Sequence, residues 1–156
     1  MTTRAVYILL VEDTPSDAEL VLASLAKVVQ RERIHVVPDG LLALDFLFCR
    51  NEYAGRASSA PPFVVLLDVK LPKVDGLEVL RQLKADPLTQ SIPVVMLTSS
   101  NIESDVATAY RLGANSYIQK PMDFEQFRET VRAVGRYWLA MNESLPAAPH
   151  TAGGAP

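Results

Sequence analysis

Four hydrophobic segments of this 156-residue chain are each followed by polar side chains that could do chemistry. These side chains belong to Glu12, Asp13, Asp68, Thr98 and Lys120. Carboxylate oxygens without His or Cys partners suit a hard divalent cation such as Mg²⁺, or Mn²⁺ in its place. A carboxylate beside such a cation and a lysine can attack phosphorus and form an acyl phosphate. The residue types therefore predict a metal-dependent phosphoryl-transfer site, provided that the fold brings them together.

The charges of this group also favour a cation. Three carboxylates and one lysine sum to a formal charge of −2, which one divalent ion neutralises. Asp68 is the best candidate for the nucleophile, because it ends the most hydrophobic central segment and should be held most rigidly. Glu12 and Asp13 are better placed to bind the metal, directly or through water.

The elements that must position these residues alternate along the chain. Continuous apolar runs predict buried parallel strands, and two weaker runs predict the edge strands. The expected strands are Ala5–Val11, Ile34–Val37, Phe63–Leu67, Pro93–Leu97 and Ser116–Gln119. Apolar residues at helical spacing predict the helices Pro15–Val29, Leu41–Cys49, Leu77–Ala85, Ile102–Leu112 and Phe124–Met141.

Strict alternation of this kind predicts an α/β fold, a doubly wound five-stranded parallel sheet with strand order 2-1-3-4-5. In such a sheet the ligand site lies at the carboxyl ends of the strands, where the polar residues above are found. A polar loop is expected over Arg50–Pro62 and a disordered tail over Glu143–Pro156. We therefore expect one domain over residues 1–142, a tail over 143–156, and no output domain.

Composition excludes several classes of protein. The net charge of −3 and the absence of basic runs argue against nucleic-acid binding. No apolar run is long enough for a membrane helix, and the first residues do not form a signal peptide. The single cysteine fits a reducing compartment. We expect a cytoplasmic protein that contacts neither nucleic acid nor membrane.

The motifs around these residues resemble those of response-regulator receiver domains, the CheY-like, flavodoxin-like phosphoacceptors of two-component signalling. The similar segments are Leu10–Asp13, Leu67–Pro72, Asp75-Gly76, Leu97–Ser99 and Lys120-Pro121. Finer features resemble stand-alone receivers that pair with phytochrome-type histidine kinases. They include the Glu52-Tyr53 loop, Lys84–Pro87, Tyr110–Asn115 and Asp123-Phe124.

The resemblance implies a role for each site residue. Asp68 would accept a phosphoryl group from a sensor histidine kinase, and Thr98 and Lys120 would contact that group. Asp13, Asp68 and the backbone oxygen of Lys70 would bind Mg²⁺, with Glu12 acting through metal-bound water. Thr98 and Tyr117 would form a conformational switch. The protein would be a single-domain response regulator that catalyses only its own phosphorylation and dephosphorylation, and so not an enzyme with an external substrate.

The last predicted helix carries one long apolar stripe. Its members are Phe127, Val131, Val134, Trp138 and Met141. A helix over Asp123–Asn142 is about 30 Å long, whereas six-residue strands span only about 20 Å. Its C-terminal end should therefore extend beyond the sheet. We expect this stripe and its neighbours to form a homodimer interface.

Three other functions are alternatives to the phosphoacceptor. A Mg²⁺-dependent aspartyl-phosphate phosphatase or phosphotransferase would usually carry a second carboxylate two residues after the nucleophile, where this chain has Lys70. A flavin-binding protein of the same topology would not place Glu12 and Asp13 in a phosphate loop. A transcription factor would need a DNA-binding module. The phosphatase is the strongest of the three alternatives.

Overall fold

Five parallel strands form one sheet in a computed structural model that describes residues 5–57 and 59–143. The strands run in the order β2-β1-β3-β4-β5, as the alternation predicts. Their bounds are β1 (Ile8–Val11), β2 (Ile34–Val37), β3 (Val64–Leu67), β4 (Val94–Thr98) and β5 (Ser116–Gln119). The two weaker apolar runs, β2 and β5, are the edge strands.

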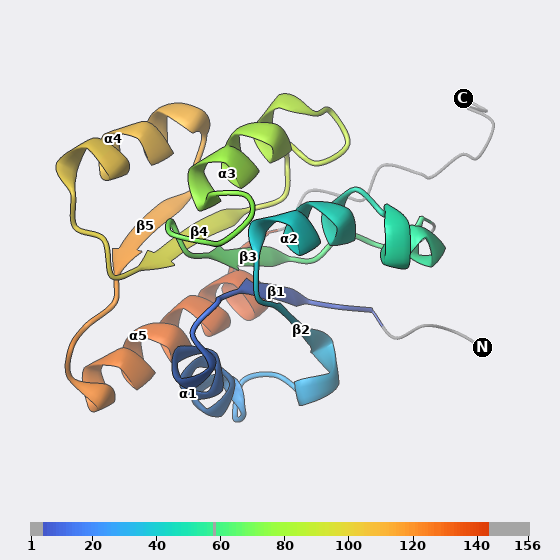
Figure 1. Ribbon diagram of the computed structural model, residues 1–156. Coiled ribbons are helices and arrows are strands. Elements are labelled where there is room, and N and C mark those ends of the chain that lie inside the picture. The colour runs from blue at the N-terminus through green and yellow to red at the C-terminus, as the bar shows by residue number, and fades with distance from the viewer. Residues whose placement is uncertain (1–4, 58, 144–156) are drawn as a thin grey trace.

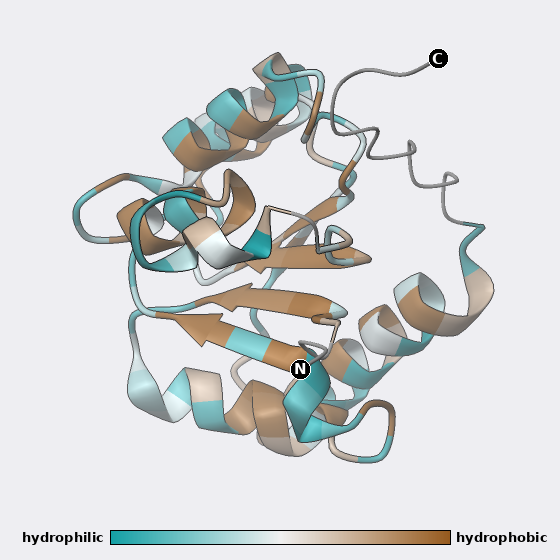
Figure 2. Ribbon diagram, turned by 90° about the vertical axis from the view of Figure 1, so that its right-hand side faces the viewer, coloured by the Kyte–Doolittle hydropathy of each residue, from teal (hydrophilic) through white to brown (hydrophobic). Residues whose placement is uncertain are grey.

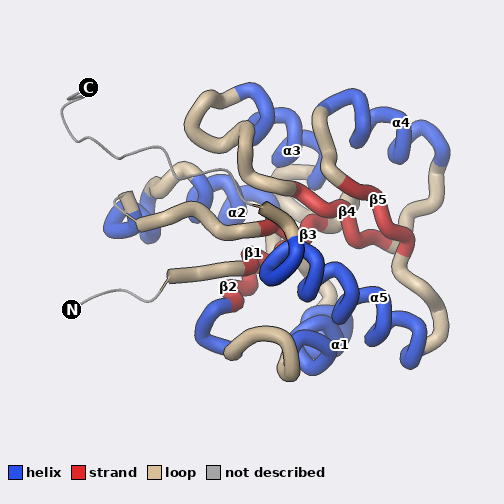
Figure 3. Tube along the Cα trace, turned by 180° about the vertical axis from the view of Figure 1, so that it is seen from behind, coloured by secondary structure: helices blue, strands red, loops and turns tan. Residues whose placement is uncertain are grey.

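Helices cover both faces of the sheet (Figure 1). Helices α1 and α5 lie on one face, and α2, α3 and α4 lie on the other. Seen from behind, α5 lies in front of the strands (Figure 3). The helix bounds are α1 (Pro15–Leu25), α2 (Gly40–Leu47), α3 (Gly76–Ala85), α4 (Glu103–Leu112) and α5 (Phe124–Arg136). The predicted doubly wound fold is confirmed.

The central strands are apolar on both sides, because each side faces a helical layer. In β1, Ile8 and Leu10 pack toward α1 and α5, whereas Leu9 and Val11 pack toward α2 and α3. Figure 2 shows the strands as almost continuously hydrophobic, with helices that are hydrophobic mainly toward the sheet. Burial on both faces holds the strands rigidly, and their carboxyl ends provide a fixed platform for side chains.

Helix ends differ from the prediction by more than two residues at two places, in α1 and α5. Helix α1 ends at Leu25, although the apolar spacing continues to Val29. Val28 and Val29 pack on the α1–α5 side from a turn that is closed by hydrogen bonds to the Leu25 carbonyl. Helix α5 ends at Arg136 and continues as a π-helical turn, η3 (Tyr137–Met141). The predicted Phe124–Met141 helix is therefore two kinds of helix.

Two short 3₁₀ helices were not predicted from the sequence. They are η1 (Arg31–Arg33) and η2 (Asn51–Arg56), the second of which lies inside the expected loop. Within the described residues, no helix is long and apolar enough to cross a membrane. The predicted disordered tail lies outside the described residues, apart from Glu143.

Two residues of the predicted dimer interface belong instead to the core of this chain. Phe127 and Val131 are only 3% and 1% exposed, and both pack with α1 on the inner face of α5. A second copy could not contact them without opening the fold, so the prediction is wrong for these two residues. Val134 and Trp138 are half-buried against the same core, and Met141 is exposed.

Candidate functional site

The polar residues that follow the strands meet at one edge of the sheet. Glu12 and Asp13 directly follow β1, Asp68 follows β3, Thr98 ends β4, and Lys120 follows β5. Sheet-type hydrogen bonds continue past the strand ends: the Asp68 amide donates to the Val11 carbonyl, and the Lys120 amide donates to the Thr98 carbonyl at 2.7 Å. The sheet therefore fixes the backbone from which these side chains extend.

Asp68 is the centre of the arrangement. Its carboxylate is buried, and both of its oxygens accept hydrogen bonds. The hydroxyl of Thr98 donates to Oδ1 at 2.6 Å, and the amide of Lys70 donates to the same oxygen at 3.3 Å. The ammonium group of Lys120 lies 3.1 Å from Oδ2. Donors from β4 and β5 thus hold the carboxylate in one orientation.

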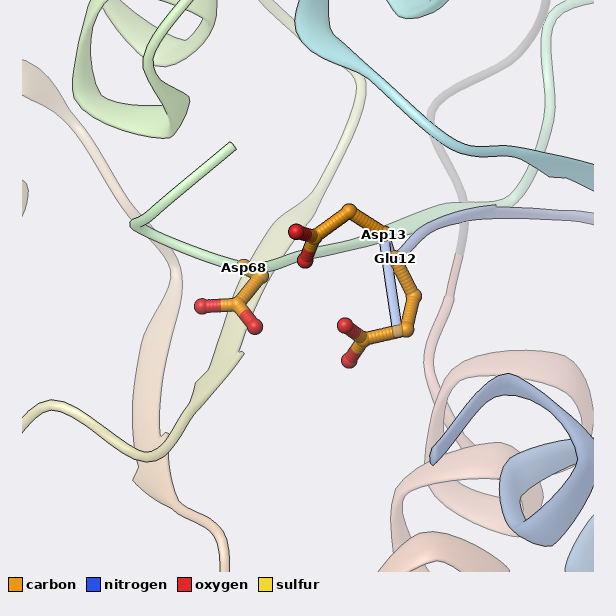
Figure 4. A group of neighbouring side chains, drawn as sticks. All are labelled: Glu12, Asp13 and Asp68. Carbon is orange, nitrogen blue, oxygen red and sulfur yellow. The ribbon is translucent and has the colours of Figure 1, made fainter. Parts of the chain in front are cut away.

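Three carboxylates converge beside this point. One oxygen each from Glu12, Asp13 and Asp68 lies within 4.8 Å of the others. Figure 4 shows their carboxylates turned toward a common space. Asp13 is exposed, whereas Glu12 and Asp68 are buried. Oxygen donors of this kind, partly open to solvent, fit Mg²⁺ or Mn²⁺, which keep water ligands in addition to carboxylates.

Lys120 balances the negative charge of the cluster. Its side chain is only 7% exposed and its ammonium group contacts Glu12, Asp68 and Asp17, the last at 3.0 Å. Burial opposes the charge of Lys120, but hydrogen bonding to Glu12 and the charge of Asp68 outweigh burial and raise its pKa above the usual lysine value. Burial also raises the pKa of Glu12, and the hydrogen bond from Lys120 opposes that rise.

Asp17 was missed by the sequence analysis. It lies in the first turn of α1, not at a strand end, and reaches Lys120 from there. Its place in the first turn of a helix that begins two residues after Asp13 was the available signal, because that turn starts beside the end of β1. Three carboxylates therefore contact one ammonium group, and the carboxylate of Asp13 lies beside two of the three, which strengthens the demand for a cation.

A chain of hydrogen bonds leads from Asp68 to Tyr117. Thr98 donates to Asp68 and accepts from the Ser100 amide at 3.2 Å. The carbonyl of Ser100 accepts from the Tyr117 hydroxyl at 2.9 Å, and the Ser100 hydroxyl donates to Asp105 of α4 at 2.7 Å. The predicted Thr98–Tyr117 pair is thus connected through Ser100, whose part in this connection the sequence did not reveal.

Gly76 lets α3 approach the site closely. A Cβ atom at this position would lie 1.9 Å from the backbone oxygen of Asp68. The Gly76 amide donates to the Val69 carbonyl at 2.7 Å, which ties the loop after Asp68 to the start of α3. The absence of a side chain here is what allows the two backbones to touch.

The comparisons with known proteins agree with this geometry. Residues 8–132 match the family model described as the response regulator receiver domain. The chain is 43% identical over 137 residues to a probable methanogenesis regulatory protein, FilR2, from Methanothrix harundinacea, and covers 86% of that protein. It is 39% identical over 141 residues to response regulator Rcp1 from Synechocystis, covering 90% of this chain and 93% of Rcp1.

Solved structures show the same fold. The crystal structure of the Mn²⁺-bound form of Rcp1 has a TM-score of 0.81 and 37% identity, and covers 90% of this chain and 99% of that one. The crystal structure of the phosphorylated cyanobacterial phytochrome response regulator RcpA has a TM-score of 0.84 and 35% identity, and covers 92% of this chain and 100% of that one.

Proposed function

This chain belongs to the response regulator receiver domain family, and we propose that it accepts a phosphoryl group on Asp68 from a sensor histidine kinase. The observation that carries the proposal is the setting of the Asp68 carboxylate. Thr98 and Lys120 hold its two oxygens, and the acidic pair Glu12 and Asp13 lies beside it. A phosphoacceptor needs each of these groups.

The transfer is a displacement at phosphorus. One oxygen of Asp68 forms a bond to phosphorus, the bond from phosphorus to the histidine nitrogen breaks, and the imidazole leaves with the electron pair and is protonated. Thr98 and Lys120, which already donate to Asp68, are placed to donate to the oxygens of the incoming group. Attack of water on phosphorus later breaks the bond to Asp68, which releases inorganic phosphate and returns the carboxylate.

The metal belongs to the same site. We expect Asp13, Asp68 and the backbone oxygen of Lys70 to hold Mg²⁺ or Mn²⁺, with Glu12 acting through a water ligand. Bound there, the ion supplies positive charge to the phosphoryl oxygens. The all-oxygen donor set of the cluster supports this assignment, and so does the Mn²⁺-bound form of the relative Rcp1.

Phosphorylation of Asp68 would act on the hydrogen-bond chain to Tyr117. A phosphoryl group adds about two negative charges and new acceptor oxygens, which draw the Thr98 hydroxyl toward them. Thr98 also accepts from the Ser100 amide, so its movement shifts the β4–α4 loop and the Tyr117 ring that bonds to it. The readout would be a rearranged surface over α4, β5 and α5.

The proposed partner is a histidine kinase, and exposed apolar side chains around the site would suit its helices. Met122 lies on the loop after Lys120, Phe124 begins α5, and Ile102 precedes α4. All three are exposed although they are large and hydrophobic. The likeness to RcpA, a phytochrome response regulator, supports a phytochrome-type kinase.

We further propose a cytoplasmic protein without an external substrate, and a homodimer that forms through the C-terminal end of α5 and η3. The exposed members of that surface are Tyr137 and Met141, and Trp138 lies half-buried beneath them. The interface would thus use the end of the apolar stripe and leave its buried beginning in the core.

The decisive experiment is phosphorylation with acetyl phosphate and Mg²⁺, followed by intact-mass spectrometry. We expect one base-labile adduct of about 80 Da, the mass of one phosphoryl group. Asp68→Asn should lack the adduct, whereas Asp86→Asn, away from the site, should retain it. Absence of the adduct from the wild type, or its presence in Asp68→Asn, would sink the proposal. Release of phosphate from p-nitrophenyl phosphate over many turnovers would instead favour the phosphatase.

A further inference from the structure

A second pocket lies at the opposite edge of the sheet from the acidic site. Several separate segments form its walls. They are Tyr7 before β1, residues 27–30 after α1, Arg33 of η1, Phe63 before β3, and Arg136, Leu139 and Ala140 at the end of α5 and in η3. These segments line a solvent-open space of about 750 Å³, a volume within the range of small-molecule pockets. No residue of the phosphoacceptor site lines it.

The floor of this pocket is aromatic and aliphatic. The rings of Tyr7 and Phe63 contact each other with centroids 5.0 Å apart. Phe63 is exposed toward solvent, although it directly precedes the buried strand β3. Leu139 of η3, Val28 and Val29 also line the pocket. An apolar body could therefore be buried between η3 and the two rings.

The rim of the pocket is cationic. Lys27, Arg33 and Arg136 line it, and none of the described lining residues carries a carboxylate. The three cations form no salt bridge within residues 5–57 and 59–143. Arg33 is the most firmly placed, since its guanidinium lies 4.9 Å from the Tyr7 ring centroid and donates to the Ala5 carbonyl. Three positive charges around one apolar space favour an anion.

We propose that this pocket binds a small anionic amphiphile, a compound with an apolar or aromatic body and one carboxylate or similar acidic group. The body would occupy the space between Phe63, Tyr7 and Leu139, and the acidic group would lie among the three cations. This site is independent of phosphoryl transfer, because it shares no residue with the acidic edge.

The test uses anilinonaphthalene sulfonate, an aromatic body with one anionic group, as the probe for the folded wild-type protein. The only tryptophan, Trp138, is the chain neighbour of Leu139, so energy transfer from Trp138 reports occupancy. We expect saturable binding with one site per chain. The uncharged N-phenylnaphthylamine, which keeps the aromatic body, should bind more weakly.

Charge reversal locates the site. Arg136→Glu and Lys27→Glu should each weaken binding by about tenfold, because an attraction becomes a repulsion. Arg111→Glu, on the exposed face of α4, is the matched control and should bind as the wild type does. Amide shifts in NMR spectra should concentrate on Tyr7, Phe63 and the segments 27–33 and 136–140.

Three results would overturn the proposal. They are equal affinity for the charged and uncharged probes, equal affinity of Arg136→Glu and Arg111→Glu, and amide shifts that concentrate away from these segments. Circular dichroism of each variant separates loss of binding from loss of fold, and the NMR shifts of the wild type need no variant at all.

Discussion

At Lys120, burial and charge act in opposite directions, and the surrounding carboxylates prevail. Its ammonium group is almost fully buried, yet Glu12, Asp17 and Asp68 keep it charged. The same contacts partly offset the mutual repulsion of the carboxylates. Removing this one side chain would leave Glu12 and Asp68 buried without a counter-charge, which is costly in a protein interior.

We expect Lys120→Met to lower the free energy of unfolding by about 3 kcal/mol in the presence of a chelator. Magnesium should restore part of this loss, because binding of the ion replaces the missing positive charge and favours the folded state. Urea unfolding with and without Mg²⁺ measures both effects. The exposed Lys27→Met, outside the acidic site, serves as the control and should change little. Equal unfolding midpoints for Lys120→Met and the wild type would contradict the expectation.

Thr98 links the acceptor carboxylate to the β4–α4 loop through one hydroxyl group. Thr98→Val should slow phosphorylation by acetyl phosphate about tenfold, because it removes one hydrogen bond to the transferring group. Thr98→Ser, which keeps the hydroxyl, should stay close to the wild type. The rate of adduct formation by mass spectrometry checks this. Similar rates for the valine and serine variants would show that the hydroxyl takes no part.

At the scale of the elements, a residue's place in the site can be predicted from the sequence where the residue directly follows a strand. Glu12, Asp13, Asp68, Thr98 and Lys120 all meet as predicted, because parallel strands bring their carboxyl ends to one edge. Asp17 could not be predicted in this way, because it reaches the site from a helix. The direction of its side chain depends on how α1 packs.

The end of α5 shows a second limit of prediction from the sequence, which concerns the type of helix. Apolar residues recur at steps of three and four through Met141, which predicts a regular helix. In the structure the Asn142 amide donates to the Tyr137 carbonyl five residues earlier, so the last turn is wider. Trp138 and Leu139 both reach the core from this turn, while Met141 faces solvent. Periodicity alone cannot reveal a wider turn, because tertiary packing selects it.

Helix α3 presses on the acceptor loop at Gly76, which gives an element-level prediction. Gly76→Ala should lower the free energy of unfolding by about 2 kcal/mol and slow phosphorylation, because the new Cβ must displace the Asp68 backbone. Gly55→Ala is the matched control, since no atom lies within 4 Å of its new Cβ. Urea unfolding and the rate of adduct formation measure the two effects. A Gly76→Ala protein as stable and as reactive as Gly55→Ala would show that the contact is not tight.

Strand β2 is joined to α2 and η2 by a cluster around His35. Its ring stacks on Phe46 with centroids 4.6 Å apart, and its Nε2 lies 2.9 Å from the Tyr53 hydroxyl. Burial lowers the pKa of His35, and the charges of Arg56 and Arg31 lower it further, against the opposing charge of Glu52. The folded state therefore resists protonation of this ring more than the unfolded state does.

The sign of the pH dependence follows from that difference. His35 contributes stability that is fully present above its unfolded pKa of about 6.5, and that is lost as the pH falls toward its lower folded pKa. We expect urea midpoints of the wild type to fall between pH 7.5 and pH 5.5, and those of His35→Gln to fall less. The difference between the two proteins isolates His35 from the carboxylates. Parallel pH profiles of the two urea midpoints would show that His35 does not contribute to the pH dependence of stability.

The whole molecule has two chemically opposite edges. The carboxyl ends of the strands carry the acidic site, and the amino ends carry the pocket lined by Lys27, Arg33 and Arg136. The net charge of −3 conceals this separation. Helix α5 starts just after Lys120 and ends at the pocket, so it runs from one edge to the other. Helix α5 is therefore a continuous structural route from the acidic edge to the exposed η3 turn.

The exposed end of that route gives the last prediction. Tyr137 and Met141 lie on η3, and Met141 is 72% exposed although it is apolar. A second copy that covers this surface would remove apolar area from water, so we expect a dimer at tens of micromolar protein. Sedimentation equilibrium should show a dimer for the wild type and a monomer for Met141→Glu and Trp138→Glu. Leu88→Glu is the matched control, because Leu88 is 80% exposed and follows α3 in the opposite helical layer. Met141 is exposed in the single chain, so its substitution tests the interface without disturbing the core. A monomeric wild type at these concentrations, or a Met141→Glu protein that dimerises as Leu88→Glu does, would exclude this surface as the interface.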